Sequence, residues 1–129
     1  MEVDEDFVES ANIDELRIIA LHVARRRVPA KPGTALFRRT GSAAIRRYVL
    51  ERAKGRCQGC GNAAPFRGTD GQPFLEAHHT TRLADDGPDH PRKVIGICPN
   101  CHKKAHLAED AKSFNRSLIR KLQILEAVL

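Results

Sequence analysis

Four cysteines in two Cys-x-x-Cys pairs constrain the fold of this 129-residue chain more than any other feature. Cys57 and Cys60 lie in CQGC, Cys98 and Cys101 lie in CPNC, and 37 residues separate the pairs. A Cys-x-x-Cys turn directs two thiolates at one point, so two such turns form a tetrahedral zinc site. Disulfide bonds are the alternative, but nothing suggests export, and a redox-active pair would need no second copy. We therefore predict a structural zinc that stabilises folding directly.

The length of the chain suits one small domain with a modest hydrophobic core. The first ten residues, MEVDEDFVES, are acidic and do not resemble a secretory signal. No apolar run approaches the roughly 18 residues of a membrane span. We therefore expect a cytoplasmic protein.

The net charge of +6 is unevenly distributed along the chain. Residues 1–15 hold seven acidic residues and no Lys or Arg. The other 114 residues hold all 22 Lys and Arg against nine acidic residues, a net charge of +13. Such an excess predicts a polyanionic partner, most often a nucleic acid. The alternative is a solvated surface that only improves solubility.

The first third of the chain predicts two helices with a linker between them. Asn12 can cap a helix that runs to about Val28, and PAKPG at residues 29–33 indicates a linker. Ser42 can cap a second helix through Ala53, which Gly55 ends. The apolar stripes of the two helices are Ile13, Leu16, Ala20 and Val23, and Ile45, Tyr48 and Val49 with Arg52 beside them.

The rest of the chain predicts two strands and two further helices, and hence an α+β fold. Residues 74–78 and 94–97 form short apolar runs typical of strands, and the segment before them, 56–74, is rich in turn residues. A short helix is expected from about Pro99 and a last helix from about Ser113. The last helix has apolar residues at helical spacing, namely Phe114, Leu118, Leu122, Leu125 and Leu129.

Four of the six histidines occur in a pattern that suggests a second metal site. His78 and His79 are adjacent in LEAHHT, and neighbouring side chains on an extended segment point to opposite sides. His102 and His106 are four residues apart and share one face of a helix. Because the cysteines anchor both segments, the zinc can bring one histidine of the pair close to this helix. The other two, His22 and His90, are expected to be ordinary surface or core residues.

The combined pattern LEAHHT…CPNCHKKAH resembles the HNH endonucleases over about residues 42–107. The resemblance implies a ββα-metal nuclease core, in which a β-hairpin is followed by a helix. The segments RRYVLERAKGRCQGCG and PFLEAHHTTRLADDGPDHP are most similar to nuclease domains of modification-dependent restriction enzymes. In those enzymes a separate domain often recognises the modified base.

This resemblance implies a metal-dependent endonuclease that hydrolyses phosphodiester bonds in double-stranded DNA. His78, His102 and His106 would bind the catalytic divalent metal, such as Mg²⁺, Mn²⁺ or Ni²⁺, and His79 would be the general base. Residues 34–129 would be the nuclease domain and residues 1–33 an acidic segment with one helix and a linker. A homodimer or a separate DNA-reading domain is expected. Candidate DNA contacts are Arg46, Arg47, Arg56, Lys93, Lys103 and Lys104.

One position departs from the family pattern. The family usually has an Asn five residues before the third cysteine, where it braces the loop, and here that residue is Lys93. A lysine could instead contact a phosphate. Two alternatives stay open: a zinc-knuckle module that binds DNA without cleaving it, in which Lys93 marks lost activity, and an interaction domain whose first and last helices contact a partner. The first predicts DNA binding without cleavage, and the second predicts no salt-dependent DNA affinity.

Overall fold

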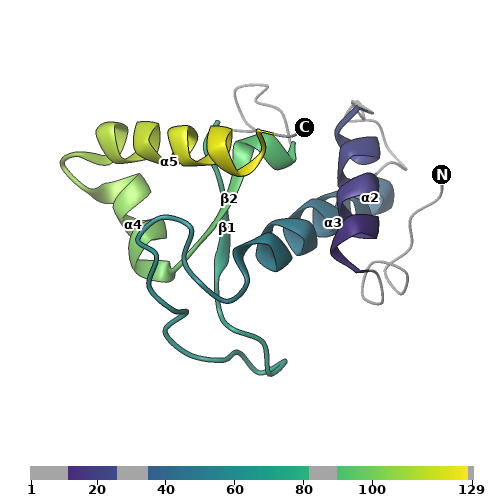
Figure 1. Ribbon diagram of the computed structural model, residues 1–129, viewed down its shortest axis with the longest axis horizontal. Coiled ribbons are helices and arrows are strands. Elements are labelled where there is room, and N and C mark those ends of the chain that lie inside the picture. The colour runs from purple at the N-terminus through teal and green to yellow at the C-terminus, as the bar shows by residue number, and fades with distance from the viewer. Residues whose placement is uncertain (1–11, 26–34, 82–89, 128–129) are drawn as a thin grey trace.

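The structure is a computed structural model that describes residues 12–25, 35–81 and 90–127 (Figure 1). These residues form the predicted α+β fold, with helices on both sides of a two-stranded antiparallel sheet. No helix in these ranges is both long and apolar enough to cross a membrane. In chain order the elements are α2 (Ile13–Arg25), α3 (Ala35–Ala53), β1 (Glu76–His79), the 3-10 turn η2 (Pro91–Lys93), β2 (Val94–Ile97), α4 (Pro99–Leu107) and α5 (Ala111–Leu125).

Helix α2 begins directly after the predicted cap, Asn12. The Asn12 Oδ1 atom accepts a hydrogen bond from the Glu15 backbone N–H at 2.9 Å, and its Nδ2 donates to Glu15 Oε1 at 2.7 Å. The first bond satisfies one of the backbone N–H groups that the first turn leaves unpaired, and the second bond holds the Asn12 side chain in the capping position. The predicted end of the helix near Val28, and the linker at 29–33, lie outside the described residues.

Helix α3 corrects one prediction and confirms another. It begins at Ala35, so Ser42 lies inside the helix and is not its cap. A glycine such as Gly41 costs a helix only about 1 kcal/mol relative to alanine, which is too little to stop propagation. The helix ends at Ala53 as predicted, where Lys54 and Gly55 turn the chain with positive φ angles of 54° and 77°.

The first strand, β1, begins two residues later than the sequence suggested. The Phe74 N–H donates to the Phe66 carbonyl at 2.9 Å, and the two rings stack with centroids 4.8 Å apart. Phe74 therefore belongs to the preceding hairpin, and β1 begins at Glu76. In the ladder with β2, His78 lies opposite Ile95 and His79 lies opposite Val94.

The two faces of this sheet pack against different helices. Gly96 of β2 faces α3 so closely that a Cβ there would lie 3.3 Å from the Ala53 Cβ and 3.4 Å from the Val49 carbonyl oxygen. The opposite face, with Ile95 and Ile97, packs against α5. Alternation along the strands therefore directs His78 towards α4 and α5 and His79 towards α3.

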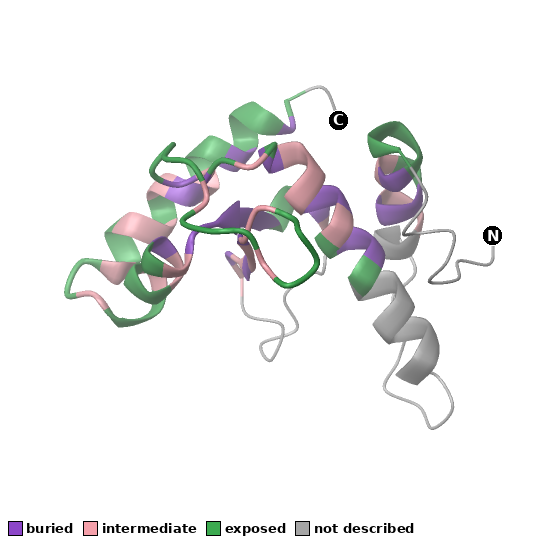
Figure 2. Cartoon of the chain, turned by 90° about the horizontal axis from the view of Figure 1, so that it is seen from below, coloured by how far each residue is buried: buried purple, intermediate pink, exposed green. Residues whose placement is uncertain are grey.

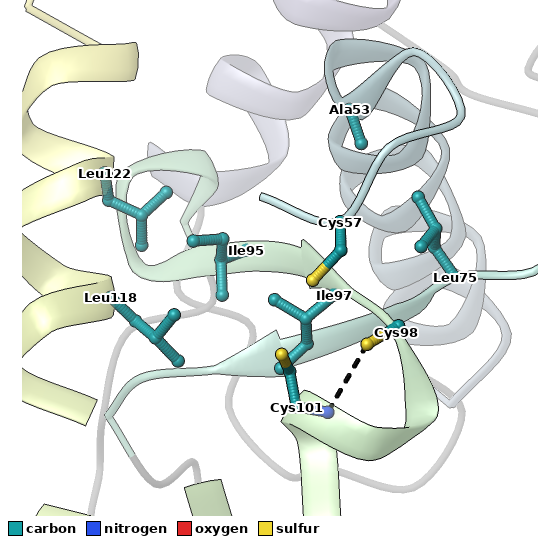
Figure 3. Close-up of a cluster of buried hydrophobic side chains, with 9 residues drawn as sticks. All are labelled: Ala53, Cys57, Leu75, Ile95, Ile97, Cys98, Cys101, Leu118 and Leu122. Atoms are coloured by element: carbon teal, nitrogen blue, oxygen red, sulfur yellow. Dashed lines mark hydrogen bonds between the residues drawn. The ribbon is translucent and has the colours of Figure 1, made fainter. Parts of the chain in front are cut away.

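The buried residues lie on the strands and on the parts of the helices beside them (Figure 2), and the hydrophobic ones form two clusters. The first joins α2, α3 and β2 through Leu16, Ile19, Ala20, Ala44, Ile45, Tyr48, Val49 and Val94. The second surrounds the cysteines and consists of Ala53, Cys57, Leu75, Ile95, Ile97, Cys98, Cys101, Leu118 and Leu122 (Figure 3).

The clusters confirm most of the predicted apolar stripes. Leu118 and Leu122 of the last helix are buried, whereas Leu125 is 40% exposed and Leu129 lies outside the described residues. In α2, Ile13 is 38% exposed, and Ile19, which was not in the predicted stripe, is buried. The predicted domain boundary after residue 33 lies outside the described residues and stays a prediction.

Candidate active site

The four cysteine sulfurs meet at one point, as the two knuckles predicted. Their Sγ atoms all lie within 4.8 Å of one another, and Cys60 is exposed at the edge of the cluster. In Figure 3 the sulfurs of Cys57, Cys98 and Cys101 are turned towards one another beside the second core cluster. Tetrahedral zinc with Zn–S bonds of about 2.3 Å requires sulfurs about 3.8 Å apart, which this arrangement accommodates.

Backbone N–H groups donate hydrogen bonds to two of the cysteine sulfurs, and these bonds favour the thiolate form that binds a cation. The N–H groups of Gly59 and Cys60 both donate to Cys57 Sγ at 3.3 Å, and the Cys101 N–H donates to Cys98 Sγ at 3.4 Å. Burial raises the pKa of Cys57, but backbone N–H bonds outweigh this effect and lower that pKa to about 7. Burial raises the pKa values of Cys98 and Cys101. A bound cation would deprotonate these two, because a coordinating thiol loses its proton.

Three histidines form a second cluster on the face of the sheet towards α4. The ligand nitrogens of His78, His102 and His106 lie within 4.8 Å of one another. Their ring centroids are separated by 5.2 Å for His78–His102 and by 5.0 Å for the other two pairs. His78 is buried, His102 is half-buried and His106 is exposed. Three imidazoles that open to solvent on one side fit a catalytic metal, which needs free positions for water and substrate.

Neighbouring polar groups support this histidine cluster. Glu76 Oε1 lies 3.6 Å from His102 Nδ1, and Asn115 Oδ1 lies 2.9 Å from His78 Nε2. Burial lowers the pKa of His78; the hydrogen bond to Asn115 opposes this effect, and the charges of the other histidines add to it. The lowered pKa of His78 favours its neutral form, which is the form that binds a metal.

A pocket with a volume of about 330 Å³ opens on the other side of the His pair. Its polar lining comes from Arg46, Glu76, His79 and His102, and Ile45, Phe74, Ala77 and Val94 line the rest. The pocket thus contains His79 and also reaches His102 at the edge of the histidine cluster. One bound group could contact both His79 and a metal on the three histidines.

The six basic side chains predicted to contact DNA all belong to the described residues and are spread over the surface. Among these six, Arg46 alone lines the pocket. Arg47 pairs with Glu51 at 2.9 Å, and the exposed Arg56 donates to the Gly61 carbonyl at 3.3 Å. Lys103 and Lys104 are exposed on α4, where Lys104 lies over the Phe114 ring. Lys93 is exposed at the end of η2.

The two remaining histidines belong to neither cluster. His90 caps η2, where its Nδ1 accepts a hydrogen bond from the Arg92 N–H at 3.0 Å. His22 is half-buried on α2, and its Nε2 has no hydrogen-bond partner within the described ranges.

Sequence reasoning missed Glu76 and Asn115. Glu76 precedes His78 by two residues and so shares its face of the strand, a spacing that could have identified it. Asn115 lies 37 positions from His78, and no local pattern connects them.

Comparison with known proteins agrees with this arrangement. Residues 57–107 match the family model of the HNH endonucleases. The chain is 35% identical over 82 residues to the type IV methyl-directed restriction enzyme EcoKMcrA of Escherichia coli (strain K12). The matched segment covers 64% of this chain and 30% of that protein. The solved structure of the type IV phosphorothioation-dependent restriction endonuclease ScoMcrA matches with a TM-score of 0.71 and 26% identity.

That structural match covers 93% of this chain and 24% of the ScoMcrA chain, so the present chain spans less than a third of either relative. The matched residues 57–107 include all four clustered cysteines and all three clustered histidines. As the sequence predicted, the residues that form both clusters match the HNH endonuclease family, and both relatives are restriction enzymes.

Proposed function

We propose that this chain is the nuclease domain of a restriction enzyme and cleaves double-stranded DNA by metal-dependent phosphodiester hydrolysis. The observation that carries the proposal is the pocket shared by His79 and His102. Within it, a phosphate would lie between a base on one face of β1 and a metal site on the other. The zinc on the four cysteines would be structural, because four thiolates leave no open position.

His79 would be the general base of this reaction. One of its imidazole nitrogens takes a proton from water, whose oxygen attacks phosphorus while the bond to the leaving 3′-oxygen breaks. A divalent cation held by His78, His102 and His106 would stabilise the negative charge on the phosphate and the leaving oxygen. Imidazole ligands favour Ni²⁺, whereas Mg²⁺ and Mn²⁺ prefer oxygen ligands such as water and phosphate, so the choice depends on metal availability as well as geometry.

The proposed DNA contacts act on the phosphate backbone. Arg46 lies in the pocket and would hold the scissile phosphate or its neighbour. Arg47, Arg56, Lys93, Lys103 and Lys104 would contact phosphates further along the duplex. Contacts of this kind position a protein without reading base sequence, so the domain alone should cleave with little specificity.

We further propose that the whole enzyme acts on modified DNA in the cytoplasm. The names of both relatives describe restriction that depends on a modification, methyl-directed in one and phosphorothioation-dependent in the other. Recognition of the modification would reside in a separate DNA-reading domain or in the partner of a homodimer. Residues 34–129 would remain the nuclease unit.

A plasmid-nicking assay tests the proposal. The zinc-loaded chain is incubated with modified and unmodified supercoiled plasmids in Mg²⁺, Mn²⁺ or Ni²⁺. We expect nicking of both plasmids with at least one metal, and no nicking by the zinc-loaded chain when the added metal is omitted. The His79→Ala variant, purified in parallel, is the control for contaminating nucleases and should bind DNA without nicking it.

The alternative of a non-catalytic zinc-knuckle module is supported by Lys93 at the family's Asn position. It would be established if the folded wild-type chain bound DNA but nicked neither plasmid under any of the three metals. An absence of salt-dependent DNA binding would instead favour the interaction domain.

A further inference from the structure

Asn115 connects helix α5 to the strand that carries the histidine pair. Its side chain is half-buried and lies outside residues 57–107, which match the family model. The Asn115 Oδ1 atom lies 2.9 Å from His78 Nε2, and its Nδ2 donates to the Thr80 carbonyl at 3.0 Å. One amide therefore contacts the chain on both sides of His79.

These two contacts together determine the tautomer of His78. The Thr80 carbonyl can only accept a hydrogen bond, so the amide must present its Nδ2 there and its Oδ1 to His78. Because Oδ1 is an acceptor, His78 Nε2 must carry a proton. The lone pair of a neutral His78 is then on Nδ1, which becomes the nitrogen available to a metal.

Thr80 extends the same network to the start of β2. Its side chain and backbone are buried, and its N–H and Oγ1 both donate to the Lys93 carbonyl at 2.8 Å. With the bond from Asn115, every backbone and side-chain polar group of Thr80 has a partner. The segment after the His pair is thus held from both sides at the position where a family asparagine is replaced by Lys93.

We propose that Asn115 is a positioning residue of the nuclease site, which fixes the metal-binding tautomer of His78 and braces the His-pair segment through Thr80. The proposal rests on the proposed function, because it assigns the three histidines to a metal. Outer groups that orient metal-binding histidines typically contribute about 10- to 100-fold to metal affinity.

The test compares Asn115→Leu, Asn115→Ala and Asn115→Asp with Ser113→Ala, a control at an exposed position on the same helix. Ni²⁺ affinity is measured by calorimetry on zinc-loaded protein, and the zinc content is checked afterwards. We expect Asn115→Leu and Asn115→Ala to weaken Ni²⁺ binding about 10- to 100-fold. Asn115→Asp retains an acceptor for His78 Nε2 and should bind Ni²⁺ at least as tightly as wild type. Ser113→Ala should match wild type.

Single-turnover nicking at saturating metal gives the second measurement. All three Asn115 variants lose the donor to Thr80, so each should nick more slowly than Ser113→Ala even when the metal site is full. Wild-type Ni²⁺ affinity in Asn115→Ala, or an Asn115→Asp affinity as weak as that of Asn115→Leu, would overturn the proposal. If the wild type binds Ni²⁺ but cleaves no DNA, the proposed function fails, while the affinity series still decides whether Asn115 positions His78.

Discussion

His78 and His79 are adjacent in the chain but have entirely different surroundings. His78 is buried between β1 and α5, with His102, His106 and Asn115 around it. His79 is half-buried on the opposite face, in the pocket lined by Arg46 and Ile45 of α3. The backbone alternation of one short strand thus separates a proposed metal ligand from a proposed base.

Replacing each histidine with alanine should produce different defects. His79→Ala removes the base and leaves the three ligands, so metal and DNA should bind normally while cleavage falls about 10²- to 10⁴-fold. His78→Ala removes a ligand, so metal affinity should fall, and excess metal should restore part of the activity. Metal titration with single-turnover cleavage measures both effects. Normal cleavage by His79→Ala together with full metal affinity in His78→Ala would reverse the assignment.

Two adjacent arginines on α3 offer a similar comparison for DNA binding. Arg46 is exposed and lines the pocket, whereas Arg47 is paired with Glu51 and is only partly exposed. We expect Arg46→Ala to weaken DNA binding for all sequences alike and to reduce the slope of log K against log salt by about 0.9, the value of one phosphate contact. Arg47→Ala should change the slope less, because the ion pair with Glu51 already offsets part of the charge of Arg47. Equal slopes for both variants would contradict the placement of Arg46 at the phosphate.

At the scale of elements, a buried polar network joins helices α2, α3 and α5. Glu126, directly after α5, is 4% exposed and accepts hydrogen bonds from Tyr48 at 2.7 Å and Arg52 at 2.6 Å. Arg17 of α2 lies 3.5 Å from the same carboxylate. Arg52 also donates to the carbonyls of Pro91 and Val94. A buried charge held by several partners makes the orientation of α5, and hence of Asn115, dependent on α2 and α3.

This network predicts an unusual titration of Tyr48. Burial, the hydrogen bond to Glu126 and the charge of that carboxylate raise the pKa of Tyr48 to about 12. The unfolded chain ionises near pH 10, so the stability that neutral Tyr48 contributes is complete below pH 10 and is lost as pH rises through about 12. Tyr48 is the only tyrosine and there is no tryptophan. Phenolate absorbance therefore reports the ionisation of Tyr48 alone. An ionisation midpoint near pH 10 in the folded protein would contradict the network.

The corresponding variant is Tyr48→Phe. Near neutral pH it should lower the free energy of unfolding by about 1 kcal/mol, the value of one hydrogen bond. The difference in unfolding free energy between wild type and Tyr48→Phe should become smaller between pH 10 and 12. Denaturant unfolding at several pH values measures this difference.

At the scale of the whole molecule, the cysteine cluster joins the two halves of the fold. Cys57 and Cys60 follow α3, and Cys98 and Cys101 begin α4. Gly59 lies against Ile97 and Leu118 so closely that a Cβ would meet both at 3.3 Å. A zinc there would therefore hold the first knuckle against the sheet and α5. Small domains often need such a link, because their cores supply little stability.

Zinc removal should therefore unfold the protein. Elemental analysis should show one tightly bound zinc per chain, and a strong chelator should abolish the cooperative thermal transition. Cys57→Ser and Cys98→Ser should give unfolded or insoluble protein, whereas His106→Ala, which alters only the second cluster, should retain the zinc and the transition. A folded Cys98→Ser variant with an unchanged melting temperature would contradict a structural zinc.

Local patterns in the sequence determined much of this protein, because they act over a few residues. The Cys-x-x-Cys turns, the cap at Asn12, the i, i+4 spacing of His102 and His106 and the alternation of the His pair are short-range geometry. They were sufficient to predict the cysteine cluster, the α+β fold and a histidine cluster around His102 and His106, whereas the choice of His78 over His79 as its third member came from the family resemblance. They failed where local signals compete, as at Ser42, whose capping chemistry was overridden by a helix already extending from Ala35.

Only the tertiary structure decided how the site is held. Asn115 contacts His78 across 37 positions, and Glu126 contacts Tyr48 across 78 positions. Contacts at such separations leave no periodicity or motif, since they depend on how helices pack against the sheet. Lys93 is another case that the sequence could not decide. A lysine in place of the family asparagine suggested that the loop is braced less firmly, yet the Lys93 backbone carbonyl accepts both hydrogen bonds from Thr80. Side-chain identity is written in the sequence, but a backbone group becomes part of a site only through folding.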